Sequence, residues 1–293
     1  LKELEHQELT AVMQEAIVVT QRLGYRYLWI DALCIVQYSE EDWLREAGCM
    51  SQVFSSAIVT LAVGDASDHL EGIFRPRRGR CVRPFWIPFC KDIPYRERIA
   101  WRGEGEVYVF PKTDFVSAGP RPKGILDTRG WILQEQLLSP CLLYFGDGEI
   151  FWDCTAVSAS ESSPILTSLL NDPNPDETWA LKLIRKTFAA SADTETLRLR
   201  FADVWKQVIK NYSARQLSKP TYSLIALEGV IRPLVVLLAD EPVAGMWMTQ
   251  LWQQLIWWVN PSLSTATPSG LPADQSFMAP TWSWLSAHEP VHY

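Results

Sequence analysis

An apolar run that ends at an aspartate is the feature that most constrains the fold. Residues 25–30, YRYLWI, predict a buried β-strand, and Asp31 follows directly. The run comes after residues 8–23, whose apolar positions recur at the helical period, and Gly24 is placed to end that helix. A helix followed at once by a buried strand predicts an α/β layered fold. We therefore expect Asp31 at the carboxyl end of the strand, the edge where open α/β sheets bind ligands.

A second amphipathic helix is predicted after Ser39, which forms a capping-box pattern with Asp42. Five apolar side chains then recur at helical spacing: Trp43, Ala47, Met50, Phe54 and Ala57. At roughly 100° per residue, Glu46 lies about 60° from the line of this stripe, so we expect it at the border of the buried face. A strand is predicted next, over residues 58–63.

The middle of the chain predicts a further helix and a hairpin. A helix over about residues 129–138 would be stopped by Pro140. One face of it would carry Trp131, Gln134, Glu135 and Leu138. The sequence CLLYFGDGEIFWDC that follows predicts a β-hairpin turning at residues 146–148.

The composition changes near residue 156. Residues 156–177 are rich in Ser, Pro, Asn and Asp, which indicates a linker or irregular segment. Beyond it the pattern predicts helices over residues 177–190, 195–213, 220–238 and 245–259. We therefore expect an α/β domain over residues 1–155, a linker over 156–177, and a mostly helical region over 178–293 that packs on the first domain.

Charge and hydropathy exclude two classes of partner. The net charge is -7, whereas nucleic-acid binding needs a basic surface, so no nucleic-acid partner is expected. No apolar run approaches 18 residues, so no membrane span is expected. The polar start of the chain, LKELEHQELT, does not have the pattern of a secretion signal.

Cysteine and histidine positions indicate neither a metal site nor disulfides. None of the six cysteines forms a CxxC pair, and the four histidines are not at the spacing of metal ligands. Cys34, Cys49 and Cys154 lie in apolar segments, where buried free thiols are normal. We therefore expect no metal and a reducing, cytoplasmic location.

Three ordered blocks resemble the HET domain of fungal heterokaryon-incompatibility proteins: YLWIDALCIVQ, then DWLREAGCMSQVFSSA, then LDTRGWILQEQLLSP with YFGDGEIFWDC. The later segments NYSARQLSKPTYSLIAL, AGMWMTQLWQQLIWW and APTWSWLS are similar to the region that commonly follows in such proteins. One family feature, a strand with a SYxWG-like motif before the first helix, is absent from this sequence. The candidate site residues below therefore all come from the later blocks.

The resemblance implies a TIR-like fold, with a flavodoxin-like arrangement of parallel strands and flanking helices. It also implies a role in programmed cell death during non-self recognition, a form of fungal innate immunity. Some TIR domains cleave NAD at the nicotinamide–ribose bond with a glutamate in a W-x-x-E helix, and Trp43 to Glu46 is similar to that element. NAD would then be a substrate of an NAD hydrolase, and no cofactor is expected.

Glu46 is the expected catalytic residue on this interpretation. Its carboxylate would orient the ribose and stabilise an oxocarbenium-like transition state, as carboxylates do in glycosidases. Trp43 or Trp131 would stack on a base. A structural role is the alternative for each: an ion pair with a basic neighbour for Glu46, and a core anchor for Trp43.

Four further residues complete the expected substrate site. Asp31 would bond to the ribose, and Arg129 would meet a phosphate beside a helix N-terminus. Gln134 and Glu135 are unusual on a buried face, which favours a shared polar site. The alternatives are that Asp31 caps the next turn and that Arg129 and Glu135 serve structural ion pairs.

Two other functions stay open at this stage. The chain is a non-catalytic signalling module, which forms a homo-oligomer or binds an incompatibility partner protein, or it is a HET-fold enzyme recruited to secondary metabolism. Cys34 is the nucleophile candidate by residue type, but no histidine lies near it in sequence, which favours a core thiol.

Overall fold

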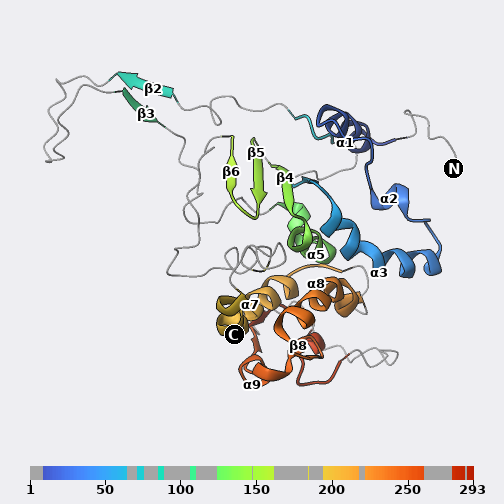
Figure 1. Ribbon diagram of the computed structural model, residues 1–293, viewed down its shortest axis with the longest axis vertical. Coiled ribbons are helices and arrows are strands. Elements are labelled where there is room, and N and C mark those ends of the chain that lie inside the picture. Colours follow the sequence, from blue (N-terminus) through green and yellow to red (C-terminus); the bar gives the residue numbers. More distant parts are fainter. Residues whose placement is uncertain are drawn as a thin grey trace, which may run out of the picture.

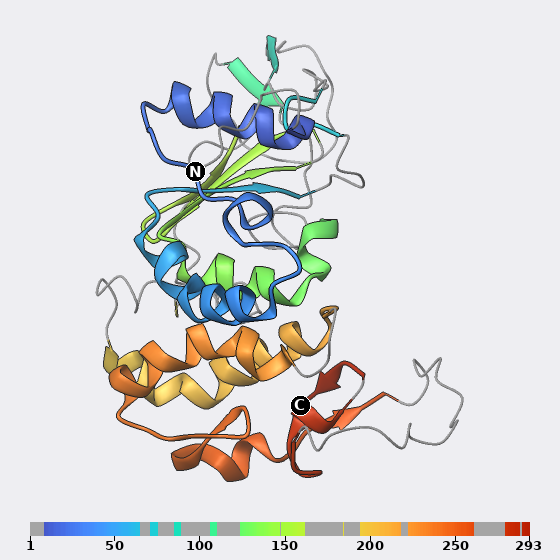
Figure 2. The ribbon, with the colours of Figure 1, turned by 90° about the vertical axis from the view of Figure 1, so that its right-hand side faces the viewer.

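The computed structural model describes residues 9–64, 71–75, 85–88, 106–109, 124–146, 148–161, 184, 194–217, 222–260, 279–287 and 289–293. These residues form layers (Figure 1). Figure 2 shows α1 on one face of the sheet and α3 with α5 on the other, followed by α7 and α8 and then by α9. The predicted α/β class is confirmed.

The sheet has four strands in the order β1-β4-β5-β6. Their bounds are β1 Thr60–Val63, β4 Cys141–Phe145, β5 Ile150–Cys154 and β6 Ser158–Ser160. Only β1 and β4 run parallel, with Thr60 opposite Leu142, and the other pairs are antiparallel. The expected parallel sheet is thus reduced to one parallel pair among the described strands. Two further strands, β2 (Phe85–Pro88) and β3 (Glu106–Val109), form a separate antiparallel pair.

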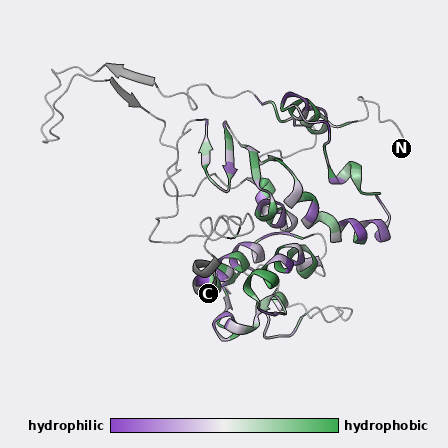
Figure 3. Cartoon of the chain, viewed as in Figure 1, coloured by the Kyte–Doolittle hydropathy of each residue, from purple (hydrophilic) through white to green (hydrophobic). Residues whose placement is uncertain are grey.

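The three helices that flank the sheet begin and end close to where the periodicity predicts. They are α1 Ala11–Arg22, α3 Glu40–Ser56 and α5 Gly130–Leu138. Ser39 caps α3 as expected, because its side chain accepts a hydrogen bond from the Asp42 amide at 3.2 Å. Gly24 follows α1 with φ +82°, a conformation that favours glycine. Hydrophilic residues colour the first turns of α3 in Figure 3, which matches its acidic start.

The strand predicted over residues 25–30 is wrong. The segment is not in a strand, Tyr25 and Tyr27 are exposed, and a short helix, α2 (Asp31–Cys34), follows it. Ile30 keeps the dihedral angles of an extended chain, φ -134° and ψ 124°. A strand also needs a hydrogen-bonded neighbour, and none of the described strands pairs with this segment. The apolar pattern therefore agrees with the extended conformation of Ile30 but did not yield a paired strand.

The expected burial of two cysteines is also wrong. Cys34 and Cys49 are exposed, and Cys154 is half-buried. Cys49 lies on α3 between Ala47 and Met50, which are buried, but its own side chain is on the exposed face of the helix. An apolar neighbourhood in sequence did not place these thiols on the inner face.

Helices α7 (Thr194–Ser213) and α8 (Ser223–Leu238) confirm the predictions over residues 195–213 and 220–238. The helix predicted over 245–259 is wrong, because only α9 (Leu251–Gln254) and a short 3-10 turn are helical there. Ala244 and Gly245 both have positive φ and turn the chain into a hairpin between β7 (Pro242–Val243) and β8 (Met246–Trp247).

Residues 245–259 do not form one helix because the turn at Ala244–Gly245 leads into strand β8, which contains Trp247. The side chain of Trp247 is fully buried, and its backbone N–H donates to the Gln254 side chain at 3.1 Å. The apolar pattern of this stretch predicted a helix buried on two sides, and both parts are wrong: Met248, Trp252 and Trp258 are exposed. Near the end of the chain, β9 (Trp258–Val259) pairs with β10 (Val291–His292), and Trp284–Ser286 form a 3-10 turn.

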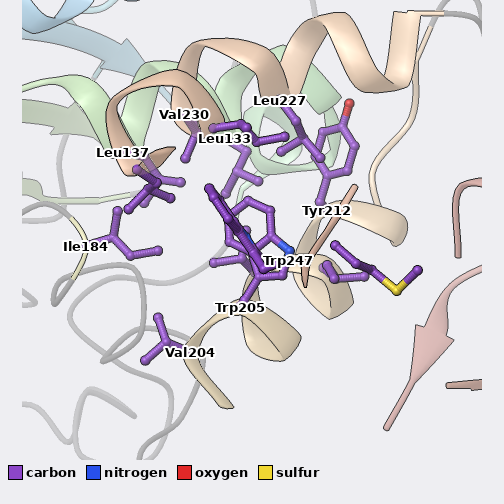
Figure 4. Close-up of a cluster of buried hydrophobic side chains, with 14 of the residues drawn as sticks. Leu133, Leu137, Ile184, Val204, Trp205, Tyr212, Leu227, Val230 and Trp247 are labelled. Carbon is purple, nitrogen blue, oxygen red and sulfur yellow. The ribbon is translucent and has the colours of Figure 1, made fainter. Parts of the chain in front are cut away.

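The main apolar core joins α5 to the C-terminal helices. Leu133 and Leu137 of α5 pack with Trp205 of α7 and with Leu227 and Val230 of α8 (Figure 4). All five side chains are buried. The first part of the chain and its C-terminal part thus share one core.

The proposed division into three parts stays a prediction. Strand β6 lies within the expected linker 156–177, so the sheet continues past residue 155. Residues 162–177 of that segment lie outside the described residues. Of the helix predicted over 177–190, the structure describes only Ile184, which is helical and fully buried in the main core.

Candidate functional site

A cavity of about 960 Å³ lies beside the free edge of β1. Its walls include α1, residues 25–30 with the start of α2, the end of α3, residues 57–63 with β1, and α5. Most of the lining is apolar, and three predicted site residues, Asp31, Arg129 and Glu135, line it together. A mainly apolar hollow of this size with a few convergent polar groups is the usual form of a small-molecule site.

Glu135 is the most perturbed acid of the site. Burial raises the pKa of its carboxyl group from 4.5 to about 7, and the negative charge of Asp31 acts in the same direction. The positive charges of Arg129 and Arg215 lower that pKa but do not cancel the effect of burial. A carboxyl group that titrates near neutral pH is suited to accept or donate a proton during a reaction.

Asp31 lies at the first position of α2 and is exposed. Its Oδ1 accepts a hydrogen bond from the Ala32 N–H at 2.8 Å, and the residue also lines the cavity. Asp31 thus stabilises the start of α2 through this hydrogen bond, and it is also placed to contact a ligand in the cavity. It does not stand at the end of a strand.

Arg129 is the N-cap of α5 and is exposed at the cavity. The backbone around it is held by residues from the C-terminal region. Gly130 N–H donates to Gln216 O at 2.8 Å, and Gln216 N–H donates to Thr128 O at 2.6 Å. These two bonds fix the direction in which α5 leaves Arg129.

Trp43 and Trp131 do not line the cavity; they contact each other. Their rings meet edge to face with centroids 5.8 Å apart, and Trp43 also stacks on Tyr222 at 4.3 Å. Trp131 packs against two buried apolar clusters. Both tryptophans therefore join α3 and α5 to the segment before α8.

Gln134 is fully buried between helices, away from the cavity lining. With its amide nitrogen toward Ala226 O, at 2.7 Å, its oxygen accepts from Ser51 N–H at 3.2 Å. A Cβ at Gly229 would come within 2.4 Å of the terminal amide group of Gln134, so the glycine allows α8 to approach this side chain closely. Gln134 is placed to bridge α3 and α8.

Glu46 lies on α3 and is not among the residues that line the cavity. Its Oε1 is 3.4 Å from Nε of the neighbouring Arg45, and 23% of its side chain is exposed. Arg45 also binds Asp42. The structure therefore groups Asp31, Arg129 and Glu135 in one site and places Glu46, Trp43, Trp131 and Gln134 elsewhere.

A polar network that the sequence did not predict supports the start of α5. Arg215 Nη2 donates to Gln136 Oε1 at 3.3 Å, and Gln136 Nε2 donates to Asp127 Oδ1 at 2.7 Å. Arg215 Nε also donates to Asn211 Oδ1 at 2.7 Å. Local periodicity carries no signal for this network because its members come from distant parts of the chain. The Asp127–Gln136 pair alone lies within one quoted motif, LDTRGWILQEQLLSP.

The described residues contain neither a metal-binding cluster nor a membrane-spanning helix. They hold no cluster of three or more His, Cys, Asp or Glu side chains arranged to bind a metal ion. Among them, no helix combines the length and the apolar character that crossing a membrane requires.

The fold and the site define an α/β protein with a cavity lined by two carboxyl groups, Asp31 and Glu135, and two arginines, Arg26 and Arg129. Residues 2–135 match the family model of the heterokaryon incompatibility protein (HET), slightly less than half of the 293 residues. The resemblance to HET proteins is thus confirmed over this segment. At the level of the family, the match implies a role in heterokaryon incompatibility. No curated protein and no solved structure matches the chain.

Proposed function

We propose that the chain is an effector of fungal non-self recognition and programmed cell death that hydrolyses NAD at the nicotinamide–ribose bond. One observation carries the catalytic part: Asp31, Arg129 and Glu135 line one cavity, and burial brings the pKa of Glu135 to about 7. The family match supports the biological part. The TIR-like fold remains an implication of the resemblance.

The chemistry assigns one role to each of the three side chains. The bond between nicotinamide N1 and ribose C1′ breaks, and its electron pair returns to the pyridinium ring, which leaves as neutral nicotinamide. Asp31 stabilises the positive charge that develops on the ribose, as carboxylates do at glycosidic bonds. Glu135 takes a proton from the water that attacks C1′, so that ADP-ribose is the second product. Arg129 binds the pyrophosphate.

Glu135 replaces Glu46 as the central carboxylate in this proposal. A general base has to reach the attacking water inside the substrate site, and Glu135 lines the cavity whereas Glu46 does not. Glu46 lies beside the guanidinium of Arg45 on α3. The W-x-x-E similarity therefore points to α3, whereas the acid that lines the cavity, Glu135, lies on α5.

The test is to incubate the purified full chain with NAD and to measure free nicotinamide. Glu135→Gln keeps the shape of the side chain and removes the base, so we expect nicotinamide release to fall by roughly a hundredfold or more. Glu46→Gln is expected to keep most of the activity. Glu228→Gln is the matched control, since Glu228 is paired with Arg232 on the exposed surface of α8.

Two outcomes would overturn the proposal. A folded wild-type chain that releases no nicotinamide, even at high protein concentration, would exclude NAD cleavage. Loss of activity in Glu46→Gln with full activity in Glu135→Gln would move the chemistry out of this cavity and back to α3.

A further inference from the structure

The helix that carries Glu135 starts at a junction between two distant segments. Arg129 and Gln216 form a parallel β-bridge, and two backbone hydrogen bonds, at 2.6 and 2.8 Å, hold the residues on either side of it. Gln216 lies beyond α7, outside the segment that matches the family model. The C-terminal region thus contacts the candidate site at the residue where α5 begins.

Arg215 adds side-chain hydrogen bonds to this junction. Among the described residues, its guanidinium donates to the Arg129 carbonyl at 3.4 Å, the Gln136 side chain at 3.3 Å and the Asn211 side chain at 2.7 Å. Arg129 precedes α5 and Gln136 lies in its second turn. The guanidinium of Arg215 therefore contacts both ends of residues 129–136, the segment that contains Glu135. Asn211 is buried on α7, and the hydrogen bond that it accepts from Arg215 Nε holds the guanidinium in this orientation.

We propose that Arg215 is a positioning residue of the candidate site, which orients the first turns of α5 so that Arg129 and Glu135 line the cavity. The proposal rests on the proposed function for its kinetic test only. The HET-matching segment supplies the site residues, and the C-terminal region sets their geometry. Family membership of residues 2–135 alone would then not be sufficient for an active site.

Electrostatics gives the same pairing an independent signature. The charged groups that act on Glu135 are Asp31, which raises its pKa, and Arg129 and Arg215, which lower it. Removing the charge of Arg215 should therefore move the titration of Glu135 to higher pH. A neutral side chain that held α5 in the same way would leave that titration unchanged.

The experiment compares Arg215→Gln and Arg215→Lys with Arg232→Gln in the full chain. Arg232 is the matched control because it pairs with Glu228 on the exposed face of α8, away from the cavity. The midpoint of Glu135 is followed by NMR of ¹³C-labelled glutamate carboxyl groups, with Glu135→Gln to assign its signal. We expect a higher midpoint in Arg215→Gln, and a midpoint near the wild-type value in Arg215→Lys and Arg232→Gln.

Nicotinamide release provides the second measurement. Both substitutions at Arg215 should lower kcat by roughly tenfold with little change in KM, because lysine keeps the charge but loses the planar guanidinium. If Arg215→Gln does not fold, Arg215→Lys still tests the guanidinium through kcat. An unchanged Glu135 midpoint in Arg215→Gln, or a wild-type kcat in Arg215→Lys, would overturn the proposal. A wild-type chain without activity would defeat the proposed function instead, and the titration would still decide the role of Arg215.

Discussion

Asp31 and Glu135 line the same cavity, and the negative charge of Asp31 adds to burial in raising the pKa of Glu135. The two residues come from segments far apart in the sequence, at the start of α2 and in the middle of α5. Their coupling makes the site sensitive to pH near neutrality, and the first two predictions follow from it.

Glu135→Gln should change the pH dependence of stability. The carboxyl group has a pKa near 4.5 when unfolded and about 7 when folded, so the folded chain prefers the protonated form. The stability that this preference contributes is fully present below about pH 4.5 and is lost as the pH rises through about 7. The loss amounts to about 3 kcal/mol. Glutamine does not ionise, so Glu135→Gln should be more stable than the wild type at pH 8 and close to it at pH 5.

Urea unfolding at pH 5 and pH 8 measures this difference. Glu228→Gln serves as the control, because its exposed pair with Arg232 contributes little at either pH. Equal stability differences at the two pH values in Glu135→Gln would contradict the assigned pKa.

Asp31→Asn should lower the pKa of Glu135. It removes the like charge and retains the oxygen that accepts from the Ala32 N–H. The expected result is a carboxyl midpoint below the wild-type value, read by NMR titration. Asp203→Asn, on the exposed face of α7 where Asp203 pairs with Lys206, should leave the midpoint unchanged. The prediction fails if both variants titrate like the wild type.

Gly130→Ala should destabilise the junction between α5 and the C-terminal region. A Cβ at Gly130 would lie 2.4 Å from the Leu217 Cδ2 atom, which forces a shift at a point held by the Gln216 backbone. We expect a loss of about 1–3 kcal/mol in the free energy of unfolding. Gly48→Ala is the matched control, since a Cβ there meets nothing within 4 Å and alanine favours helices by up to about 1 kcal/mol.

Combining Gly130→Ala with Leu217→Ala gives a sharper version of the same measurement. Truncating Leu217 removes the atoms that the new methyl group would meet, so the two losses should not add. Full additivity would show that the leucine side chain is not the obstacle.

Trp43→Ala should reduce stability without altering the titration of the site. Trp43 stacks on Tyr222 and meets Trp131 edge to face, and it does not line the cavity. Losing these contacts should cost about 2 kcal/mol. Thermal unfolding measures the cost, and the NMR midpoint of Glu135 should stay at its wild-type value. A shifted midpoint with unchanged stability would restore the earlier expectation that Trp43 belongs to the site.

Local sequence patterns predicted the helices better than they predicted which segments pair or pack together. Helical periodicity placed α1, α3, α5, α7 and α8 within a few residues, because each buries one regular face. It failed for residues 25–30 and 245–259, where pairing and turn geometry decide the outcome. Positive φ at Ala244 and Gly245 redirects the second stretch, and no hydrophobic pattern encodes that turn.

The site was predicted in part for the same reason. Residue type and the family resemblance predict Asp31, Arg129 and Glu135 as site residues, and the tertiary fold brings them to one cavity. Glu46 lies at the edge of the α3 stripe as its angle predicts, but an angle around one helix does not say which neighbour the side chain meets. Arg215 could not be chosen at all, because its role depends on contacts with α5, which comes much earlier in the chain.

The shared core of α5 and the C-terminal helices has a practical consequence for anyone cutting this chain. Leu133 and Leu137 are among the last residues of the matched segment or just beyond it, and both are buried against α7 and α8. A fragment ending near residue 155 would present these leucines to water, together with the side of Trp131 that packs on the same cluster. Expression of that fragment is therefore expected to yield aggregated protein, and a missing activity in it would say nothing about the intact chain.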